Sequence, residues 1–391
     1  MTAPSIEVRA RRNQFLGMSP AQFLRGYWQK KPLLIRGAFA AKNDWIAPND
    51  LAGLACEELA LSRIVKHDAK RDCWTVRNGP FTEKDFAKLP KKDWTLLVQD
   101  VDKWDTDVAP ILDAFSFIPS WRIDDVMVSY AEDRGGVGAH VDHYDVFLIQ
   151  GIGRRRWRID ADKKNGHEFR DDAELKLLRK FTPTHEWILE PGDALYLPPG
   201  IAHEGTATGE CMTFSVGMRA PSNAELMLDF SEFLAETLGD DLRYADPDLT
   251  SVNDPNEITD HALKRLRASL PRFADVDKST LATWFGKFIT RYRAAHDAAP
   301  SPKQITKAQL ARILPTHDIV RNPWSRMAWT RDGRNALLFI AGESYSCPQN
   351  VAELVSGSRD IDGIKLLKHH KALGLFTDLI NRGHWLLRRS K

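Results

Sequence analysis

The sequence predicts an antiparallel β-barrel, followed by a helical region and then by a C-terminal unit of helices with a small hairpin. Short apolar runs between residues 124 and 220 are separated by Gly and Pro, a pattern typical of the strands of a closed or sandwiched barrel. Residues 222–225, Ser-Asn-Ala-Glu, form a capping box in front of an apolar pattern with helical spacing. Asp332-Gly333 lies between two apolar runs and predicts the turn of a hairpin.

These patterns divide the chain into four segments, since 391 residues exceed what one ordinary core holds. The segments are an N-terminal extension at 1–18, the barrel at 19–220, a helical region at 221–299 and a C-terminal unit at 300–391. The division follows changes in apolar periodicity and the Pro-rich stretch at 298–302, which predicts a linker.

Within the barrel segment, Ser19-Pro20 predicts the start of a helix. Pro32 predicts its end, because proline lacks the N–H that a continuing helix needs. The apolar residues 33–35 predict a buried strand. Further strands are expected at 94–101, 121–131, 145–150, 154–159, 194–197 and 212–218, and helices at 108–115 and near the end of 168–180.

Beyond the barrel, helical spacing predicts helices at 226–234, 257–270 and 278–293. The last segment combines expected helices at 306–314 and 373–381 with the hairpin around Asp332-Gly333. Helices joined to a small hairpin are the composition of a winged-helix fold, so we expect that fold at the C-terminus.

The formal charge of +2 does not indicate a strongly basic nucleic-acid-binding protein, so direct nucleic-acid binding is not expected. Basic residues cluster at positions 9–12 and 388–391, and we interpret both clusters as solvated, frayed termini. The four cysteines are scattered without a Cys-x-x-Cys spacing, which argues against a disulfide framework or a structural zinc site. The N-terminal residues lack the apolar core of a signal peptide, and no apolar run reaches the roughly twenty residues of a membrane helix. We therefore expect a soluble cytoplasmic protein without a membrane partner.

Two short motifs carry the chemistry: His140-Val141-Asp142, and the segment 192–203, which ends in His203. Residues two apart in a strand share a face, so His140 and Asp142 are expected to point together into the barrel. The rigid Pro-Pro-Gly turn at 198–200 leads a second strand to His203. Alone, the first motif would be a surface pair and the second an ordinary turn. Together, two imidazoles and one carboxylate predict the facial triad of a non-haem iron site, with open positions for a cosubstrate and oxygen.

The basic strand 154–158 adds a second prediction. Arg155 shares a face with Trp157 and Ile159, which favour burial, so Arg155 is expected to point inward. A buried guanidinium needs an anionic partner, and a dicarboxylate such as 2-oxoglutarate provides one. The alternative is an exposed strand whose arginines are all solvated.

A zinc hydrolase is the competing metal-site interpretation, with Glu204 as its general base. The strand neighbour of a ligand points away from the metal, which argues against that role for Glu204. The inward Arg155 favours iron and 2-oxoglutarate instead.

These residues resemble a known family. Segment 192–203 resembles the second cupin motif, although Ala207 replaces the usual Asn, and Asp142 stands where JmjC-type oxygenases replace the second His of the first motif. More specifically, the chain resembles the bacterial JmjC ribosomal oxygenases from about Phe23 to the C-terminus. The segments that carry this resemblance are 27–32, 121–125, 135–142, 144–147 and 151–157.

The resemblance implies a double-stranded β-helix (a cupin/JmjC jelly-roll barrel), a helical dimerisation region and a winged-helix domain. It implies that Fe(II) is bound by His140, Asp142 and His203, and that 2-oxoglutarate is bound by Arg155 and Ser129, with O2 as the second cosubstrate. No catalytic residue beyond the metal centre is implied. The substrate would be an arginine of large-subunit ribosomal protein sixteen, and the enzyme a homodimer.

Two alternatives stay open at this point. The same chemistry could act on a histidine or a methyl-lysine of another protein. The barrel could instead be a non-catalytic ligand sensor attached to a nucleic-acid-binding winged helix, although a sensor has no need of the complete triad together with Arg155.

Overall fold

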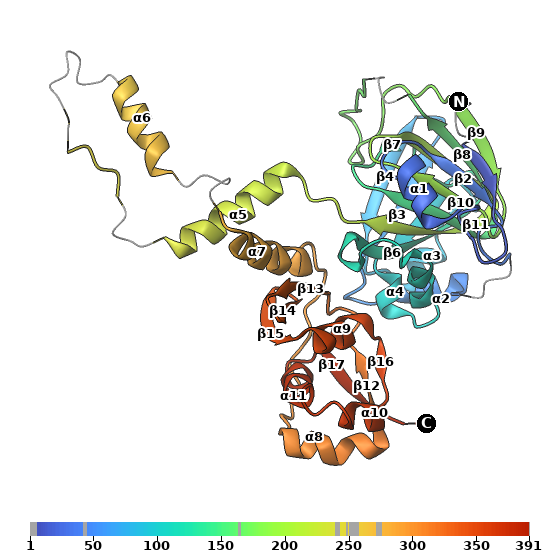
Figure 1. Cartoon of the computed structure of the whole chain (residues 1–391). Helices are drawn as coiled ribbons and strands as arrows, with labels where there is room; N and C mark the ends of the chain where they lie inside the picture. The colour runs from blue at the N-terminus through green and yellow to red at the C-terminus, as the bar shows by residue number, and fades with distance from the viewer. Residues whose placement is uncertain are drawn as a thin grey trace. The chain divides into compact units, whose positions relative to one another are not determined.

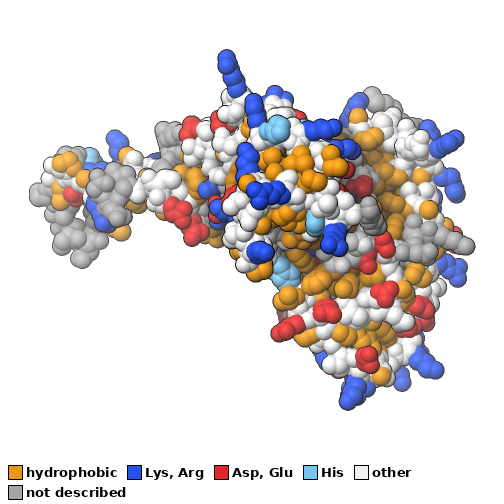
Figure 2. All heavy atoms as spheres, turned by 90° about the horizontal axis from the view of Figure 1, so that it is seen from below, with side chains coloured by type: hydrophobic (Ala, Val, Ile, Leu, Met, Phe, Trp, Pro, Cys, Tyr) orange, Lys and Arg blue, Asp and Glu red, His pale blue; other side chains and the backbone are white. Residues whose placement is uncertain are grey.

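The computed structural model describes residues 6–41, 45–162, 166–238, 243–247, 249, 258–270 and 276–390 (Figure 1). The chain divides into two compact units, Met1–Ala220 and Pro221–Lys391, each with a hydrophobic core of its own. On the face seen in Figure 2, charged side chains of both signs alternate with apolar ones.

Among the described residues, the first unit contains one 11-stranded sheet, in which β8 and β11 are the long central strands. They pair antiparallel from Ala202 opposite Asp160 to Gly217 opposite Val146, with register shifts near Met212. Apolar side chains of β8 and β10, among them Leu148, Trp157 and Leu195, pack together in one cluster. The strands are β1 (Glu7–Arg9), β2 (Leu33–Arg36), β3 (Ser62–Asp68), β4 (Cys73–Asn78), β5 (Trp94–Val98), β6 (Ile123–Ala131), β7 (His140–Val141), β8 (Val146–Asp160), β9 (His185–Leu189), β10 (Ala194–Leu197) and β11 (Ala202–Met218).

Short helices accompany this sheet. Ser19 caps the first of them through a capping box with Gln22, as its position before Pro20 predicts. The segment predicted as helical before Phe115 is a 3-10 helix. The helices are α1 (Pro20–Gly26), α2 (Pro48–Leu54), α3 (Glu83–Phe86) and α4 (Val101–Trp104), with the 3-10 helices η1 (Ala109–Phe115) and η2 (Ser120–Arg122).

The expectation of frayed termini is wrong for the described part of both ends. Strand β1 pairs in parallel with β2, with Val8 opposite Ile35, and Leu16 is only 1% exposed in the core. At the other end, β17 (Trp385–Arg389) buries Trp385 completely. At both ends an apolar residue of the strand packs in a core, Val8 at one end and Trp385 at the other, whereas the arginine side chains of these strands remain exposed.

The helix expected near the end of 168–180 is also absent from the described residues of that segment, which contain an isolated bridge between Phe169 and Leu178. Long-range contacts outweigh helical propensity here. Arg170 forms an ion pair of 2.6 Å with Asp72, and the amide of Leu178 donates to the carbonyl of Ala139 at 2.8 Å. The segment is thereby held against the residue that precedes β7.

The second unit begins with three helices, α5 (Asn223–Thr237), α6 (Asp260–Ser269) and α7 (Lys278–Arg291). The predicted capping box is confirmed, since Glu225 N donates to Ser222 Oγ at 3.2 Å. Helix α7 packs on a sheet of β13 (Met327–Asp332), β14 (Asn335–Ile340) and β15 (Glu343–Pro348), and a Cβ on Gly286 would lie 2.3 Å from the ring of Phe339. The expected boundary at 299/300 therefore does not separate two packing units, because α7 shares the core of the segment that follows it.

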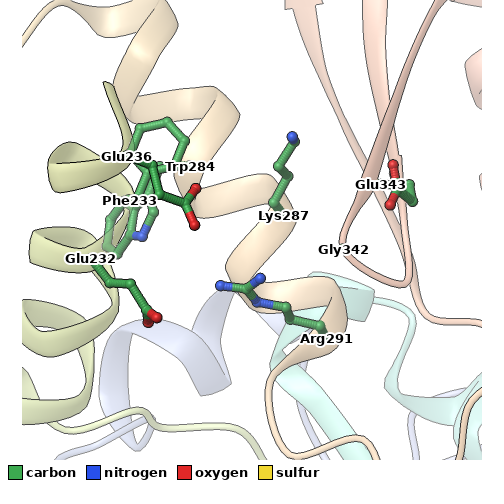
Figure 3. Close-up of a pocket in the computed structure, with 8 residues that line it drawn as sticks. All are labelled: Glu232, Phe233, Glu236, Trp284, Lys287, Arg291, Gly342 and Glu343. Atoms are coloured by element: carbon green, nitrogen blue, oxygen red, sulfur yellow. The ribbon is translucent and has the colours of Figure 1, made fainter. Parts of the chain in front are cut away.

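A cavity of about 280 Å³ lies beside α5 and α7 (Figure 3). Its lining combines the carboxylates of Glu232 and Glu236 with the cations of Lys287 and Arg291, around the ring of Trp284.

The rest of this unit matches the winged-helix expectation. The predicted hairpin is confirmed, with Asp332 opposite Asn335 and Gly333 at a φ of +57°. A second sheet has the order β16-β12-β17, and Phe376 packs edge-on against Trp385 beneath it. The elements are α8 (Lys307–Ile313), η4 (Leu314–Thr316), β12 (His317–Arg321), α9 (Gln349–Gly357), β16 (Asp360–Ile361), α10 (Gly363–Leu367) and α11 (Leu373–Asn381).

No helix in the part of the chain that the structure describes is long and apolar enough to cross a membrane.

Candidate metal centre

The structure brings His140, Asp142 and His203 together. His140 lies on β7 directly opposite His203 on β11, and Asp142 follows β7 by one residue. One potential ligand atom from each residue lies within 4.8 Å of the other two. The distance from Asp142 Oδ2 is 4.0 Å to His140 Nε2 and 3.6 Å to His203 Nε2.

Backbone geometry explains how motifs sixty residues apart meet. The amide of Gly200 donates to the carbonyl of Asp142 at 2.8 Å, which ties the Pro-Pro-Gly turn to the end of the first motif. Gly200 has a φ of +82°, a conformation that glycine adopts without steric cost. The turn thus delivers His203 to the strand position opposite His140.

Hydrogen bonds orient both imidazoles. Nδ1 of His140 lies 2.9 Å from the carbonyl of Gly138, and Nδ1 of His203 lies 2.9 Å from the carbonyl of Ile201. A carbonyl accepts, so each Nδ1 donates to its carbonyl, and each Nε2 is the ring nitrogen near Asp142. Burial, and then the neighbouring His140, lower the pKa of His203 to about 4, so it is neutral at pH 7 and free to act as a ligand. Two imidazoles and one carboxylate fit a divalent cation with open coordination positions.

Arg155 is buried on β8, which confirms that it points inward. Its side chain is 5% exposed, and Nη1 donates to Ser129 Oγ at 3.2 Å. Nε and Nη2, which lie along one edge of the guanidinium, have no hydrogen-bond partner among the described residues. Two parallel N–H groups on one edge match a carboxylate, which accepts both in a bidentate pair. Ser129, expected to contact the cosubstrate, is seen in this structure as the residue that holds Arg155.

Trp157 lies near both Arg155 and His203. Its ring centroid lies 5.9 Å from the Arg155 guanidinium carbon and 6.0 Å from the centroid of the His203 ring. On β11, a Cβ on Gly205 would lie 2.7 Å from the Trp157 ring. Glycine is therefore required at this position if the indole is to keep its place beside the two groups.

The interpretation that Glu204 points away from the centre is confirmed. Arg158 Nε donates to its carboxylate at 2.8 Å on the outer face of the sheet. A carboxylate so engaged lies on the wrong side of the strand to serve the His pair as a general base.

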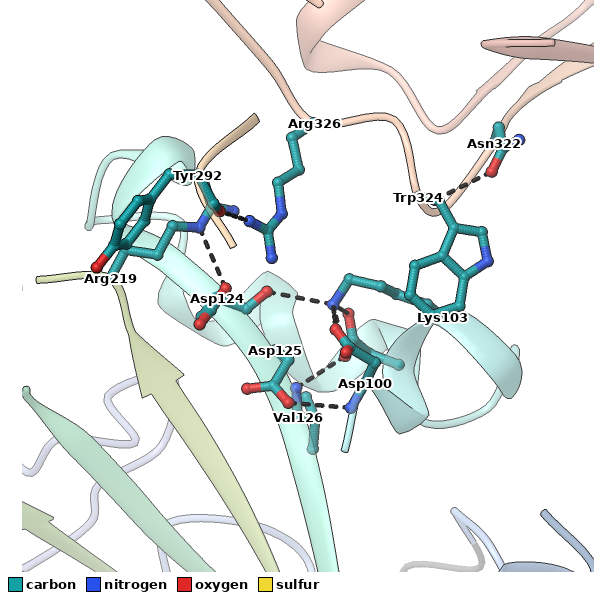
Figure 4. A network of polar contacts seen from close by, with 11 residues as sticks. Asp100, Lys103, Asp124, Asp125, Val126, Arg219, Tyr292, Asn322, Trp324 and Arg326 are labelled. Carbon is teal, nitrogen blue, oxygen red and sulfur yellow. Dashed lines mark hydrogen bonds and ion pairs between the residues drawn. The ribbon is translucent and has the colours of Figure 1, made fainter. Parts of the chain in front are cut away.

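Sequence reasoning missed Asp125 and Tyr144. Asp125 lies on β6 four residues before Ser129, on the same face of the strand, and its Oδ2 accepts from the amide of Asp100 at 2.9 Å (Figure 4). Burial raises the pKa of Asp125 to about 7; the charge of Lys103 opposes the shift, whereas nearby carboxylates, Asp100 first, add to it. A polar residue on the inner face of a predicted strand was the signal available in the sequence.

Tyr144 follows the first motif by two residues, and nearby carboxylates affect its pKa. Burial, and then the charges of Asp142 and Asp125, raise its pKa, whereas Arg63 lowers it. The side chain still keeps 39% of its surface exposed. The charges of both Asp142 and Asp125 thus act on Tyr144, which places these three residues in one electrostatic neighbourhood beside the first motif.

Comparison with known proteins identifies this arrangement. Residues 110–226 match the model of the JmjC domain, and residues 266–386 match that of the ROXA-like winged helix. The chain is 39% identical over 374 residues to the ribosomal protein uL16 3-hydroxylase of Escherichia coli, covering 93% of this chain and 96% of that protein. The chain belongs to the JmjC ribosomal oxygenases.

Solved structures of a JmjC ribosomal oxygenase agree with this assignment. The crystal structure of YcfD from Escherichia coli superposes with a TM-score of 0.84 at 33% identity, over 95% of this chain and 99% of that one. Another YcfD structure, in complex with cobalt and 2-oxoglutarate, has a TM-score of 0.80 at the same identity and coverage. The predicted JmjC cupin barrel and winged helix are therefore confirmed, and the protein is a 2-oxoglutarate-dependent oxygenase with a metal centre.

Proposed function

We propose that this oxygenase is an Fe(II)-dependent protein hydroxylase that 3-hydroxylates an arginine side chain of a large-subunit ribosomal protein. One atom of O2 enters the substrate C–H bond as a hydroxyl group, and the other enters succinate as 2-oxoglutarate loses CO2. The observation that carries the proposal is the buried Arg155, whose free Nε–Nη2 edge lies on the same inner face of the sheet as the His and Asp side chains.

One group of residues is assigned to the metal and another to the cosubstrate. His140, Asp142 and His203 would hold Fe(II), the metal to which a two-His, one-carboxylate set is typically dedicated in oxygenases. Arg155 would bind the distal carboxylate of 2-oxoglutarate, and Ser129 would keep the guanidinium in place through its 3.2 Å hydrogen bond. The bound metal and cosubstrate supply the oxidant, so the task of the protein is to orient them and exclude water.

The charge near the metal centre supports a cationic substrate. Asp100, Asp102 and Asp125 lie around Lys103, whose Nζ is 2.6 Å from Asp100 and 3.3 Å from Asp102. Arg219 pairs with the adjacent Asp124 (Figure 4). The cluster thus contains three carboxyl groups and one ammonium group. A guanidinium entering beside Asp125 would be attracted by these carboxylates.

Asp125→Asn is expected to lower kcat/KM for an arginine-containing substrate more than tenfold, because a hydrogen bond between charged groups is worth about 1.5–3 kcal/mol. The pKa of Asp125 near 7 sets the pH dependence: the carboxyl gains a proton as the pH falls below 7 and loses its attraction for the guanidinium. Wild-type kcat/KM should therefore fall from pH 8 to pH 6, and the variant should lack this limb.

Thermal unfolding provides the control for this variant. A carboxyl whose folded pKa lies above its unfolded value of about 3.9 destabilises the folded state increasingly as the pH rises between the two values. Asp125→Asn should thus unfold at a higher temperature than the wild type at pH 8 while being less active. A variant that loses activity and stability together would point to a structural role instead.

The reaction itself is tested by incubating the protein with Fe(II), 2-oxoglutarate, ascorbate and unmodified large ribosomal subunits, followed by intact mass analysis of the ribosomal proteins. We expect one protein to gain a single oxygen only when 2-oxoglutarate is present, and fragmentation to locate it on an arginine. Oxygen on a histidine, or loss of a methyl group from a lysine, would contradict the proposed arginine target. The 2-oxoglutarate-dependent oxygenase chemistry would still stand. Unchanged masses without succinate formation would contradict the proposed hydroxylation of a large-subunit ribosomal protein.

We further propose a homodimer formed through the helical region. Helices α5 and α6 expose large apolar side chains, with Leu228 73% and Leu263 50% exposed, and such side chains are expected to be covered in solution. A second copy is the occupant that the family resemblance implies. The molar mass in solution, measured by light scattering, tests this proposal.

We also propose that the enzyme acts in the cytoplasm, because that is where a bacterial ribosomal-protein substrate is found.

A further inference from the structure

The charge of the chain is distributed very unevenly. Residues 300–391 contain 15 Lys and Arg but 7 Asp and Glu, a formal charge of +8, although the whole chain carries only +2. The preceding 299 residues therefore carry a formal charge of −6. The near-neutral total charge was the reason not to expect nucleic-acid binding. That total is the sum of two oppositely charged parts of the chain.

Several of these basic residues converge on one end of the winged helix, around η4. Gly363, at the start of α10, packs so closely that a Cβ would lie 1.9 Å from the carbonyl of His317 and 2.2 Å from that of Leu314. Arg389 on β17 pairs with His317 on β12. We call the exposed cations gathered here the basic end; they are Arg312, Lys365, Lys368, Lys371 and Arg389.

The acidic residues nearby are engaged in the fold. Asp318 Oδ1 accepts from Gly363 N at 3.2 Å and from Ser390 Oγ at 3.1 Å. Asp362 caps α10 by accepting from Lys365 N at 2.8 Å. No cation of the basic end forms an ion pair with any residue that the structure describes. Its charges are therefore available to an external anion.

We propose that the basic end binds the phosphate backbone of RNA. Exposed Lys and Arg side chains spread over a turn and a strand end match a row of phosphates, and their release of counterions supplies the binding free energy. On the side of the molecule where α8 and α10 lie, Lys and Arg side chains are prominent in Figure 2, with His side chains among them.

The proposal does not include recognition of RNA bases. Helix α11 of the winged helix has no side chains free to contact base edges. Most of α11 is buried, and it contains no Lys or Arg. The side chain of Asn381 is occupied by both backbone groups of Ile305, and Asp378 pairs with Arg382. Contacts to phosphates without contacts to base edges position a protein but specify no sequence.

The choice of RNA over other polyanions rests on the proposed function. A ribosomal protein is assembled on ribosomal RNA, so a basic winged helix would raise the local concentration of the enzyme where its substrate resides. RNA binding itself is measured without turnover, so its failure would leave the proposed hydroxylation untouched.

The test measures fluorescence anisotropy of a labelled 30-nucleotide RNA hairpin with the full-length protein at several salt concentrations. We expect the wild-type affinity to fall steeply as salt rises, and K365E/K368E/K371E to bind at least about tenfold more weakly at 0.1 M salt with a salt slope reduced by about 2. The matched control K88E/K91E/K92E changes the charge equally at three exposed lysines of the barrel unit and should stay within about twofold of the wild type.

Three outcomes would overturn the proposal. They are equal losses in the two triple variants, no binding of the hairpin at low salt, and binding of polyglutamate or of vesicles containing phosphatidylglycerol as tight as that of RNA. Unchanged unfolding temperatures establish that the variants are folded, since all six lysines are exposed.

Discussion

Asp142→Ala is expected to abolish hydroxylation, because it removes one of three proposed ligands. The two remaining imidazoles would have to hold the metal without the carboxylate that lies 3.6 Å from His203 Nε2. Loss of an outer hydrogen-bond partner alone weakens metal sites roughly 10–100-fold, so loss of a ligand should cost more. Titration with Co(II), followed by its visible absorption, should give a dissociation constant raised at least about 100-fold.

Glu204→Ala is the matched control for this variant. Glu204 is also a carboxylate and adjoins a proposed ligand, but it pairs with Arg158 on the outer face of the sheet. We expect it to retain Co(II) affinity and turnover within about threefold, since a partly exposed ion pair contributes at most about 1 kcal/mol. Full turnover by Asp142→Ala, or an equal loss in both variants, would contradict the assignment of the centre.

Arg155→Met is expected to raise KM for 2-oxoglutarate by one to three orders of magnitude. The methionine fills a similar volume, but it removes the two N–H groups that are free to bind a carboxylate. Truncating one partner of a buried, hydrogen-bonded charge pair costs about 2–5 kcal/mol, and each 1.4 kcal/mol corresponds to a factor of ten. The loss should appear mainly in KM, because the distal carboxylate is remote from the bond that is broken.

Two further arginine variants separate charge from position. Arg155→Lys keeps the charge without the planar fork, so it should recover part of the affinity but not the bidentate pair. Arg154→Met changes the exposed neighbour on the opposite face and should leave KM within about twofold. If Arg155→Met were saturated at the wild-type concentration of 2-oxoglutarate, the cosubstrate would have to bind elsewhere.

Local patterns in the sequence were sufficient for much of the site. Residues two apart in a strand share a face whatever the fold around them, so alternation alone paired His140 with Asp142 and turned Arg155 inward. The same rule placed Glu204 outside. The capping box before α5 and the Asp-Gly turn between β13 and β14 were equally local, and the structure confirms both.

Tertiary contacts overrode local signals at several positions. Arg9 looked like part of a solvated terminus, but β1 is held by its pairing with β2, which is distant in sequence. The segment with Arg170 lacked its expected helix because Asp72 and Ala139 hold it. Helix α7 joined the C-terminal core because Gly286 allows the ring of Phe339 to approach.

The sequence by itself determined the chemistry of this protein, namely which residues form the metal motifs, on which face they lie and which family they resemble. Only the tertiary structure decided that Ser129 occupies one nitrogen of Arg155 while the opposite edge stays free, and that the charges of Asp125 and Asp142 both act on Tyr144. The physical reason is range. Side-chain alternation and capping act over a few residues, whereas hydrogen-bond satisfaction, burial and charge density depend on strands that the fold brings together from distant positions.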